Sequence, residues 1–267
     1  MDACEVSDAA RVEVSRRLDA VERSEGVRVL YACESGSRAW GFASADSDYD
    51  VRFLYLRPRT FYLAIDLEDQ RDVIESPLDG VWDVNGWDLR KALQLLRKSN
   101  PPLFEWLQSP FVYREVGSVA ARIRGLLATF FRPDAAAHHY LHMARGNYRE
   151  YLRGERVWRK KYFYVLRPLL ACRWIDAGLG AVPMEFGRLV EATVHDPGER
   201  AAIERLLAEK RAGGELGEGP RVAEIGALID AEFQRQSTLR PSRERTPTPV
   251  APLNALFTSA LDEIWSR

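Results

Sequence analysis

The feature that most constrains this chain is a Gly-Ser pair followed, twelve residues on, by two aspartates, all between two strand-like segments. Residues 27–32 form a β-branched and aromatic run that predicts a buried strand, and residues 49–55 alternate as a second strand would. Because side chains at i and i+2 of a strand point to the same face, Asp48 and Asp50 are expected to project together. The motif therefore predicts a polar site at a strand–turn–strand junction.

The two aspartates predict a metal site, because neighbouring carboxylates repel each other unless a cation lies between them. Mg²⁺ takes oxygen ligands and usually binds together with substrate phosphates. Gly36 and Ser37 come just before a predicted short helix over residues 38–42, where backbone N–H groups and the serine hydroxyl suit a phosphate. The sequence thus predicts a phosphate cradle facing a magnesium site formed by Asp48 and Asp50.

These motifs resemble the signature of the polymerase-β-type nucleotidyltransferase superfamily. Five further segments resemble RNA-repair-associated predicted nucleotidyltransferases (RlaP-like proteins): residues 38–41, 86–91, 99–101, 105–110 and 160–164. The resemblance implies an α/β (α+β) fold, with a small mixed-sheet nucleotidyltransferase domain followed by a helical domain. It also implies that Arg38 belongs to the nucleotide-binding site.

The resemblance further implies a third metal-binding carboxylate on a strand. Asp83 lies inside a predicted third strand over residues 80–85, whereas Asp88 fits the N-cap of the helix that follows. Asp83 is therefore favoured as the third catalytic and metal-binding residue beside Asp48 and Asp50, with Asp88 as the alternative. Two Mg²⁺ ions, or Mn²⁺ in their place, are the implied cofactors.

The order of predicted elements divides the chain into two domains. Strands dominate residues 1–113, the expected catalytic domain, and residues 114–267 show helical periodicity with no convincing strand. A Pro-, Ser-, Thr- and Arg-rich stretch over residues 237–252 predicts an extended linker. An amphipathic helix that docks back on the protein is expected after it, with apolar residues Leu253, Leu256, Phe257, Leu261 and Trp265.

The composition limits the classes of partner. The 267 residues are 46% hydrophobic with a formal net charge of −1, so any polynucleotide would have to be held by a local basic patch. The candidates for such a patch are Arg145, Arg149, Arg153, Arg156 and Arg159. A cytoplasmic protein with no membrane partner is expected, because the three cysteines are scattered and neither a signal peptide nor a membrane-spanning run is evident.

A second basic segment is a candidate for binding the triphosphate. If residues 159–167 form a helix, Lys160, Tyr164 and Arg167 fall on one face, with Lys161 beside them. Such a stripe predicts a clamp for the pyrophosphate leaving group. The alternative is an exposed basic stripe with Tyr164 packed at its edge.

The expected reaction is transfer of a nucleoside monophosphate from an NTP such as ATP to an acceptor hydroxyl, with release of pyrophosphate. The resemblance implies that the acceptor is an RNA end and that the role is RNA repair or modification. Adenylylation of a small molecule or of a protein hydroxyl remains open, because one fold supports several acceptors. A nucleotide-binding regulatory module without catalysis is the alternative from another class. The preferred NTP and the oligomeric state are left open by the sequence.

Overall fold

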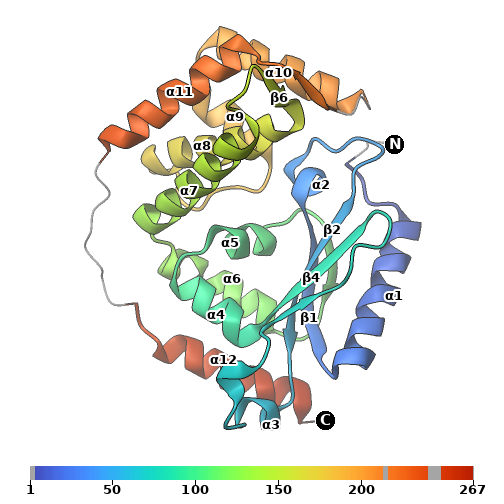
Figure 1. Cartoon of the computed structure of the whole chain (residues 1–267). Helices are drawn as coiled ribbons and strands as arrows, with labels where there is room; N and C mark the ends of the chain where they lie inside the picture. Colours follow the sequence, from blue (N-terminus) through green and yellow to red (C-terminus); the bar gives the residue numbers. More distant parts are fainter. Residues whose placement is uncertain (1–3, 213–215, 240–247, 267) are drawn as a thin grey trace. The chain divides into compact units, whose positions relative to one another are not determined.

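The computed structural model describes residues 4–212, 216–239 and 248–266, and it divides the chain into two compact units (Figure 1). The first, here called the sheet unit, is built from Glu5–Ala39, Asp48–Phe130 and Thr246–Arg267. The second, the helical unit, is built chiefly from Trp40–Ser47 and Phe131–Arg245. Each unit thus joins segments that are distant in the sequence, and the predicted combination of a small sheet with a helical part is confirmed.

Five strands form the sheet, in the spatial order β3-β4-β2-β1-β5. Their bounds are β1 Arg28–Ser35, β2 Tyr49–Leu56, β3 Val73–Glu75, β4 Trp82–Asp88 and β5 Val112–Glu115. The sheet is mixed, as predicted, because β2 pairs antiparallel with β1 and parallel with β4. β5 pairs with the other edge of β1, so β1 is buried along almost its whole length.

Helix α1 (Asp8–Glu25) covers one face of the sheet, on the right of Figure 1. The hydroxyl of Ser7 caps it by accepting a hydrogen bond from the backbone N–H of Ala10 at 3.2 Å, and Gly26 ends it in the left-handed conformation. Its apolar stripe, which includes Val14 and Leu18, packs into a core with residues of β1, β2 and β4. This core fixes the face on which the strands can place polar side chains.

The other face of the sheet is covered by helices on the left of Figure 1. They are α4 Leu89–Arg97, α5 Pro101–Leu107 and α6 Val119–Phe130, with α12 Ala251–Trp265 packed on α4 and α6. Two short helical segments, α3 Arg59–Tyr62 and η1 Leu67–Asp69, lie between β2 and β3. The unit is therefore a sheet between helical layers, as expected for an α/β domain.

Two helices that the sequence assigned to the helical domain lie in the sheet unit. The predicted boundary followed residue 113, yet α6 packs on β1 and α12 packs on α4 and α6. A helical hydrophobic stripe shows that a segment packs, but it does not show against which partner. In the last helix, α12, Leu253, Leu256 and Leu261 are buried.

The helical unit is built around α8 (Tyr162–Asp176). The helices packed with it are α7 Pro133–Tyr151, α9 Phe186–Thr193, α10 Pro197–Arg211 and α11 Ala223–Thr238. The sequence predicted a basic stripe along one face of this segment, but α8 is buried on several sides at once. A helix that neighbours cover on most sides leaves few positions, such as half-buried Tyr164, for contact with a ligand.

The prediction that the second half contains no strand is wrong. β6 (Arg156–Trp158) and β7 (Glu218–Pro220) pair antiparallel, and a 3₁₀ turn, η2 Arg159–Lys161, precedes α8. Strands of three residues that pair across sixty positions leave no periodicity to detect. The predicted linker, residues 237–252, begins within α11 and ends within α12, and residues 240–247 lie outside the described part. Across the described ranges, no helix has the length and apolarity needed to span a membrane.

Candidate active site

The Gly-Ser motif stands where β1 runs directly into the short helix α2 (Gly36–Trp40). The φ angle of Gly36 is +63°, in the left-handed region that glycine adopts without strain. A Cβ atom at this position would overlap Oδ2 and Cγ of Asp50. Residue 36 is therefore restricted to glycine both by its backbone conformation and by the approach of Asp50. The helix also begins at Gly36, two residues earlier than predicted, so half-buried Ser37 lies in its first turn.

The site contains two carboxylates on adjacent strands. Asp50 in β2 and Asp83 in β4 are partners in the parallel register, so their side chains lie on the same face of the sheet. Asp48 lies two residues before Asp50, ahead of the strand, and is exposed. The structure thus brings Asp50 and Asp83, two of the three predicted catalytic residues, side by side, and Asp48 lies just ahead of β2.

Arg52 lies between the two carboxylates, and sequence reasoning did not single it out. Its Nη2 donates to Oδ2 of Asp83 at 2.7 Å and to Oδ1 of Asp50 at 3.2 Å, while its Nη1 donates to the Asp83 carbonyl at 3.0 Å. The sequence did contain a signal for this role, because Arg52 follows Asp50 at the i+2 spacing that places strand residues on one face. Arg52 supplies positive charge where the carboxylates would otherwise repel.

The environment raises the pKa of Asp50 above its ordinary value. Burial is the main cause, and the negative charges of Asp83 and Asp48 add to it. The guanidinium of Arg52 acts in the opposite direction. A site with such an excess of carboxylate charge favours the binding of a further cation.

Behind Asp50 lies Glu34, a second residue that sequence reasoning did not assign to the site. It is fully buried, and it accepts hydrogen bonds from the backbone N–H of Asp50 at 2.9 Å and from the hydroxyl of Tyr113. Burial raises the pKa of the Glu34 carboxyl to about 7. Glu34 therefore fixes the backbone that carries Asp50, and its own charge changes near neutral pH.

The donor atoms around Asp83 suit a hard cation. Asn85 donates from Nδ2 to Oδ1 of Asp83, and its own Oδ1 is buried with no hydrogen-bond partner among the described residues. Carboxylate and amide oxygens are ligands that Mg²⁺ accepts. No group of three or more His, Cys, Asp and Glu residues in the described ranges is close enough to hold a metal. Asp50, Asp83 and Asn85 thus fit the chemistry of the ion without forming a closed protein cage.

Asp88, the alternative third carboxylate, lies elsewhere. It pairs in register with Tyr55, at the opposite end of β4 from Asp83. It caps α4 by accepting a hydrogen bond from the backbone N–H of Arg90 at 2.7 Å, and it accepts another from the Tyr62 hydroxyl at 2.7 Å. The predicted N-cap is confirmed, and Asp88 is not beside the other carboxylates.

Arg38, a predicted nucleotide-binding residue, is almost completely buried. Its guanidinium lies over the ring of Tyr49, 4.1 Å from the centroid, and Tyr49 stacks on Trp82 at 4.5 Å between centroids. Tyr49 and Trp82 immediately precede Asp50 and Asp83 in their strands. Arg38 therefore packs on the residues that support the carboxylates.

The predicted triphosphate clamp belongs to the helical unit, and its members differ in exposure. Lys160 is exposed in the turn η2, whereas the ammonium of Lys161 lies over two rings, 4.4 Å from the centroid of Tyr151 and 4.6 Å from that of Tyr164. Burial lowers the pKa of Lys161, and the neighbouring charge of Lys160 adds to the effect. Lys160, Lys161 and half-buried Tyr164 thus form one cluster.

Arg167 differs from the prediction that it joins Lys160 and Tyr164 in a clamp for the pyrophosphate. Only 2% of it is exposed, and its guanidinium donates to the carbonyls of Met184 at 3.1 Å and Pro183 at 3.3 Å. It also lies over the ring of Trp40, 4.9 Å from the centroid. Because α8 is covered on several sides, the guanidinium of Arg167 is buried, and backbone carbonyls in the core accept its hydrogen bonds.

The segment between the two halves of the motif belongs to the helical unit. In this segment, Trp40–Ser47, the ring of Phe42 stacks on Phe163 at 4.5 Å, and the ammonium of Lys210 donates to the hydroxyl of Ser44 at 2.5 Å. Sequence reasoning did not foresee this packing. The loop that joins Gly36-Ser37 to the aspartates is therefore held by α8 and α10, while both of its ends continue into the sheet unit.

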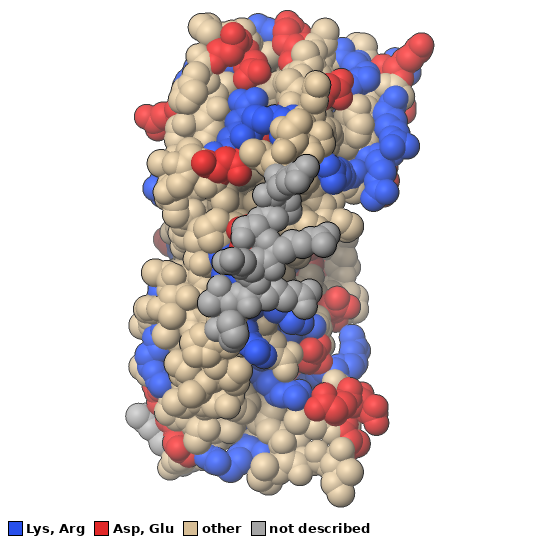
Figure 2. Space-filling model, turned by 90° about the vertical axis from the view of Figure 1, so that its left-hand side faces the viewer, with Lys and Arg blue, Asp and Glu red and all other residues tan. Residues whose placement is uncertain are grey.

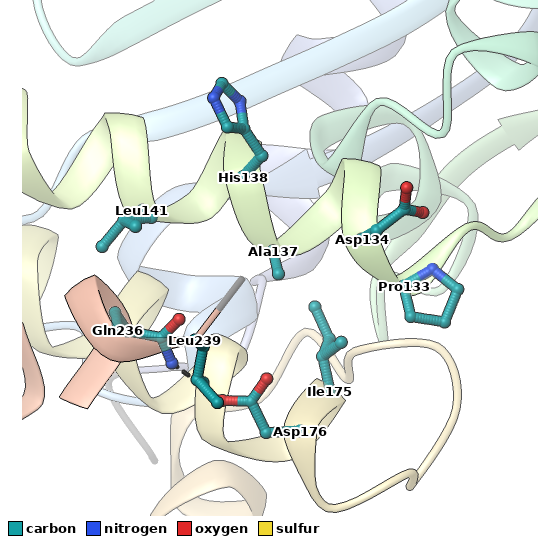
Figure 3. Close-up of a pocket in the computed structure, with 9 residues that line it drawn as sticks. All are labelled: Pro133, Asp134, Ala137, His138, Leu141, Ile175, Asp176, Gln236 and Leu239. Carbon is teal, nitrogen blue, oxygen red and sulfur yellow. Dashed lines mark hydrogen bonds between the residues drawn. The ribbon is translucent and has the colours of Figure 1, made fainter. Parts of the chain in front are cut away.

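The helical unit also contains a pocket of about 250 Å³ between α7, α8 and α11 (Figure 3). Its lining combines apolar side chains such as Leu141 and Ile175 with the carboxylates of Asp134 and Asp176. Figure 3 shows Gln236 donating to Asp176, at 2.8 Å, and the ring of His138 pointing away from that carboxylate. None of the predicted site residues lines this pocket.

Three comparisons show which known proteins this chain is similar to. The chain is 45% identical over 249 residues to the uncharacterized protein YcgL of Bacillus subtilis (strain 168), a match that covers 93% of this chain and 95% of that protein. A crystal structure of a nucleotidyltransferase-like protein from Exiguobacterium sibiricum 255-15 matches 95% of this chain and 91% of its own, with a TM-score of 0.33 and 12% identity. The family model described as RNA repair pathway DNA polymerase beta family, RlaP, matches residues 10–259. The chain belongs to this family.

Proposed function

We propose that this protein transfers a nucleoside monophosphate from an NTP to a hydroxyl at an RNA end and releases pyrophosphate. The observation that carries the proposal is the register of Asp50 and Asp83, whose carboxylates lie side by side next to Gly36. The family's association with RNA repair supports RNA as the acceptor. Adenylylation of a small molecule or a protein is the competing outcome of the test below.

In this reaction the acceptor oxygen attacks the α-phosphorus, the bond between that phosphorus and the bridging oxygen to the β-phosphate breaks, and pyrophosphate leaves. Asp48, Asp50 and Asp83 would hold two Mg²⁺ ions together with oxygens of the triphosphate, because these carboxylates do not form a closed metal site by themselves. The ions would lower the pKa of the acceptor hydroxyl and neutralise the triphosphate. The carboxylate of Asp83 accepts the proton of the hydroxyl. The backbone of Gly36 and the hydroxyl of Ser37 hold the phosphates.

Arg52 has a part in this site that the metal ligands do not have. Its hydrogen bonds to the carboxylates, at 2.7 Å to Asp83 and 3.2 Å to Asp50, fix the orientation of both side chains. As a fixed cation it also keeps the pair from repelling before the nucleotide binds. Arg52 therefore preorganises the carboxylates and reduces the reorganisation needed on binding.

Lys160, Lys161 and Tyr164 are assigned to the leaving pyrophosphate. Lysine acts on phosphate as a point charge, and the two ammonium groups are neighbours in the chain. Arg167 is left out of this set, because its guanidinium is occupied by backbone carbonyls in the core. We expect the loss of Lys160 or Lys161 to raise the KM for NTP while folding is retained.

The test is to incubate the protein with each NTP labelled at the α-phosphate, with Mg²⁺ and with RNA, protein and metabolite pools in turn. Label in RNA supports the proposal, and label in another pool reassigns the acceptor. Asp50→Asn and Asp83→Asn should each lower transfer by about 10²-fold or more, while the exposed Asp69→Asn variant serves as the control.

A non-catalytic nucleotide-binding module is a second candidate, because Arg52 satisfies both carboxylates without a metal. It predicts that NTP binds while no pool acquires label. Near-normal transfer by Asp50→Asn or Asp83→Asn would contradict the catalytic assignment itself.

A further inference from the structure

Helix α7 carries a row of exposed arginines in the helical unit, outside the site described above. Arg145 and Arg149 lie on the helix, and Arg153 follows just beyond its end at the same four-residue spacing. Residues four apart lie on one face of a helix, with a rise of about 6 Å between them. Within residues 4–212, 216–239 and 248–266, no carboxylate forms an ion pair with any of the three.

The arginines line a groove of about 400 Å³ that also contains aromatic side chains. Tyr148 of α7 and Phe233 of α11 are half-buried there and meet edge to face, 5.3 Å between centroids. The Tyr148 hydroxyl donates to Oδ1 of Asp230 at 3.3 Å, which orients the ring. His142 completes the lining. Cations and aromatic faces are thus combined in one groove.

We propose that this groove binds single-stranded RNA, with the arginines on successive phosphates and the aromatic pair beside a base. A row of cations along a groove with rings for stacking is how proteins hold single strands without reading their sequence. An apolar ligand would offer no negative charge to the three arginines, none of which forms an ion pair with a described carboxylate. This inference rests on the proposed function for the nature of the acceptor. It adds a binding groove for the RNA strand that contains none of the catalytic carboxylates.

The distribution of charge supports a local contact with RNA. The whole chain has a net charge of −1, so there is no general attraction to polyanions. Figure 2 shows that Lys and Arg side chains gather in clusters on the face drawn, with acidic side chains between them. The pocket of Figure 3, nearer the N-terminal end of α7, is lined by Asp134 and Asp176, whose carboxylates would repel a phosphate. The basic groove is therefore bounded on that side by acidic residues.

The experiment measures binding of a fluorescent 12-nucleotide oligo(U) RNA by anisotropy over a series of salt concentrations, without NTP or Mg²⁺. Replacing Arg145 and Arg149 by Ala should weaken binding on the order of 10-fold or more at low salt. The slope of log affinity against log salt should become shallower by about 1.4, since each single-strand phosphate contact contributes about 0.7. The matched control is Arg188→Ala with Arg205→Ala, two exposed arginines of the same unit that do pair with carboxylates.

A second pair of variants tests the aromatic contact. Tyr148→Ala should weaken RNA binding on the order of 10-fold at every salt concentration, with an unchanged slope, because a stacked ring contributes independently of salt. Tyr148→Phe loses the hydrogen bond to Asp230 but keeps the ring and its edge-to-face contact with Phe233, so it should bind nearly as the wild type does. A melting temperature for each variant shows that the helical unit is folded.

The outcomes separate this inference from the proposed function. If the arginine variants and their controls bind oligo(U) alike, or if a duplex RNA of the same length binds more tightly than the single strand, the groove assignment is overturned while nucleotide transfer can stand. If the arginine variants lose RNA binding in a protein that labels no RNA pool, the groove is supported and the catalytic proposal fails alone.

Discussion

The carboxylate of Asp50 occupies the space that a side chain on residue 36 would need. This relationship joins the two halves of the motif, because the residue that turns the chain into α2 also leaves room for the carboxylate. It explains why the glycine and the aspartate, fourteen positions apart, act as one unit in the fold.

Gly36→Ala should therefore be damaging in two ways. The positive φ and the overlap with Asp50 should lower the free energy of unfolding by about 1–3 kcal/mol. Displacement of the Asp50 carboxylate should also lower nucleotide transfer by about 10²-fold. Denaturant unfolding and the label-transfer assay measure the two effects.

The control is Gly125→Ala in α6, where an added Cβ meets no atom within 4 Å and helix propensity improves. That variant should be as stable as the wild type or slightly more stable. A Gly36→Ala protein with normal stability would show that Asp50 can move aside at little cost.

Arg52→Ala should make the protein depend on Mg²⁺ for stability. Without the guanidinium, Asp50 and Asp83 repel each other, so the free energy of unfolding in EDTA should fall by about 2–4 kcal/mol. A divalent cation between the carboxylates should restore part of the loss. Melting temperatures in EDTA and in Mg²⁺ measure this difference.

In the wild type, Mg²⁺ should change the melting temperature less than it does in Arg52→Ala. Arg52→Lys is the conservative comparison, since it keeps the charge and loses the forked contact. Equal responses of the wild type and Arg52→Ala to Mg²⁺ would place the ion away from these carboxylates.

Glu34→Gln should change how stability depends on pH. The pKa of Glu34 is raised from its ordinary 4.5 to about 7, so the folded protein holds the proton more tightly than the unfolded chain does. Protonated Glu34 therefore contributes about 3 kcal/mol to the free energy of unfolding. This contribution is fully present below about pH 4.5 and is lost as the pH rises to about 7. Glu34→Gln should lack this contribution, which urea unfolding at pH 5 and pH 7.5 would reveal.

The exposed Glu75→Gln variant should follow the wild type between those two pH values. Asp88, whose pKa burial raises to about 6, remains in every variant and contributes equally to each. A Glu34→Gln protein that loses as much stability between pH 5 and pH 7.5 as the wild type would contradict the assigned titration.

Substitutions of Arg167 and Lys161 should distinguish a structural role from contact with the substrate. Arg167→Met removes a buried cation that donates to two carbonyls and should lower the free energy of unfolding by about 2–4 kcal/mol. Lys161→Met should leave stability within about 1 kcal/mol and raise the KM for NTP. Unfolding curves and NTP titrations measure the two effects. Unchanged NTP kinetics in Lys161→Met would show that Lys161 has a structural role and does not bind the pyrophosphate.

Local sequence determined the features whose causes lie within a few residues. Three features follow from periodicity, backbone conformation or a neighbouring donor: the strands on either side of the motif, the glycine at the turn and the capping of α4 by Asp88. Such interactions are the same in any fold that contains the segment, so they could be predicted. They were sufficient to indicate the family.

Tertiary structure alone decided which distant residues meet. The parallel register of β2 and β4 sets Asp83 beside Asp50, and pairing across the sheet places Glu34 and Tyr113 behind them. Packing also assigned α6 to the sheet unit and buried Arg167 in the core. These outcomes depend on the total apolar surface that each arrangement buries, a quantity that belongs to the whole chain and that no single segment carries.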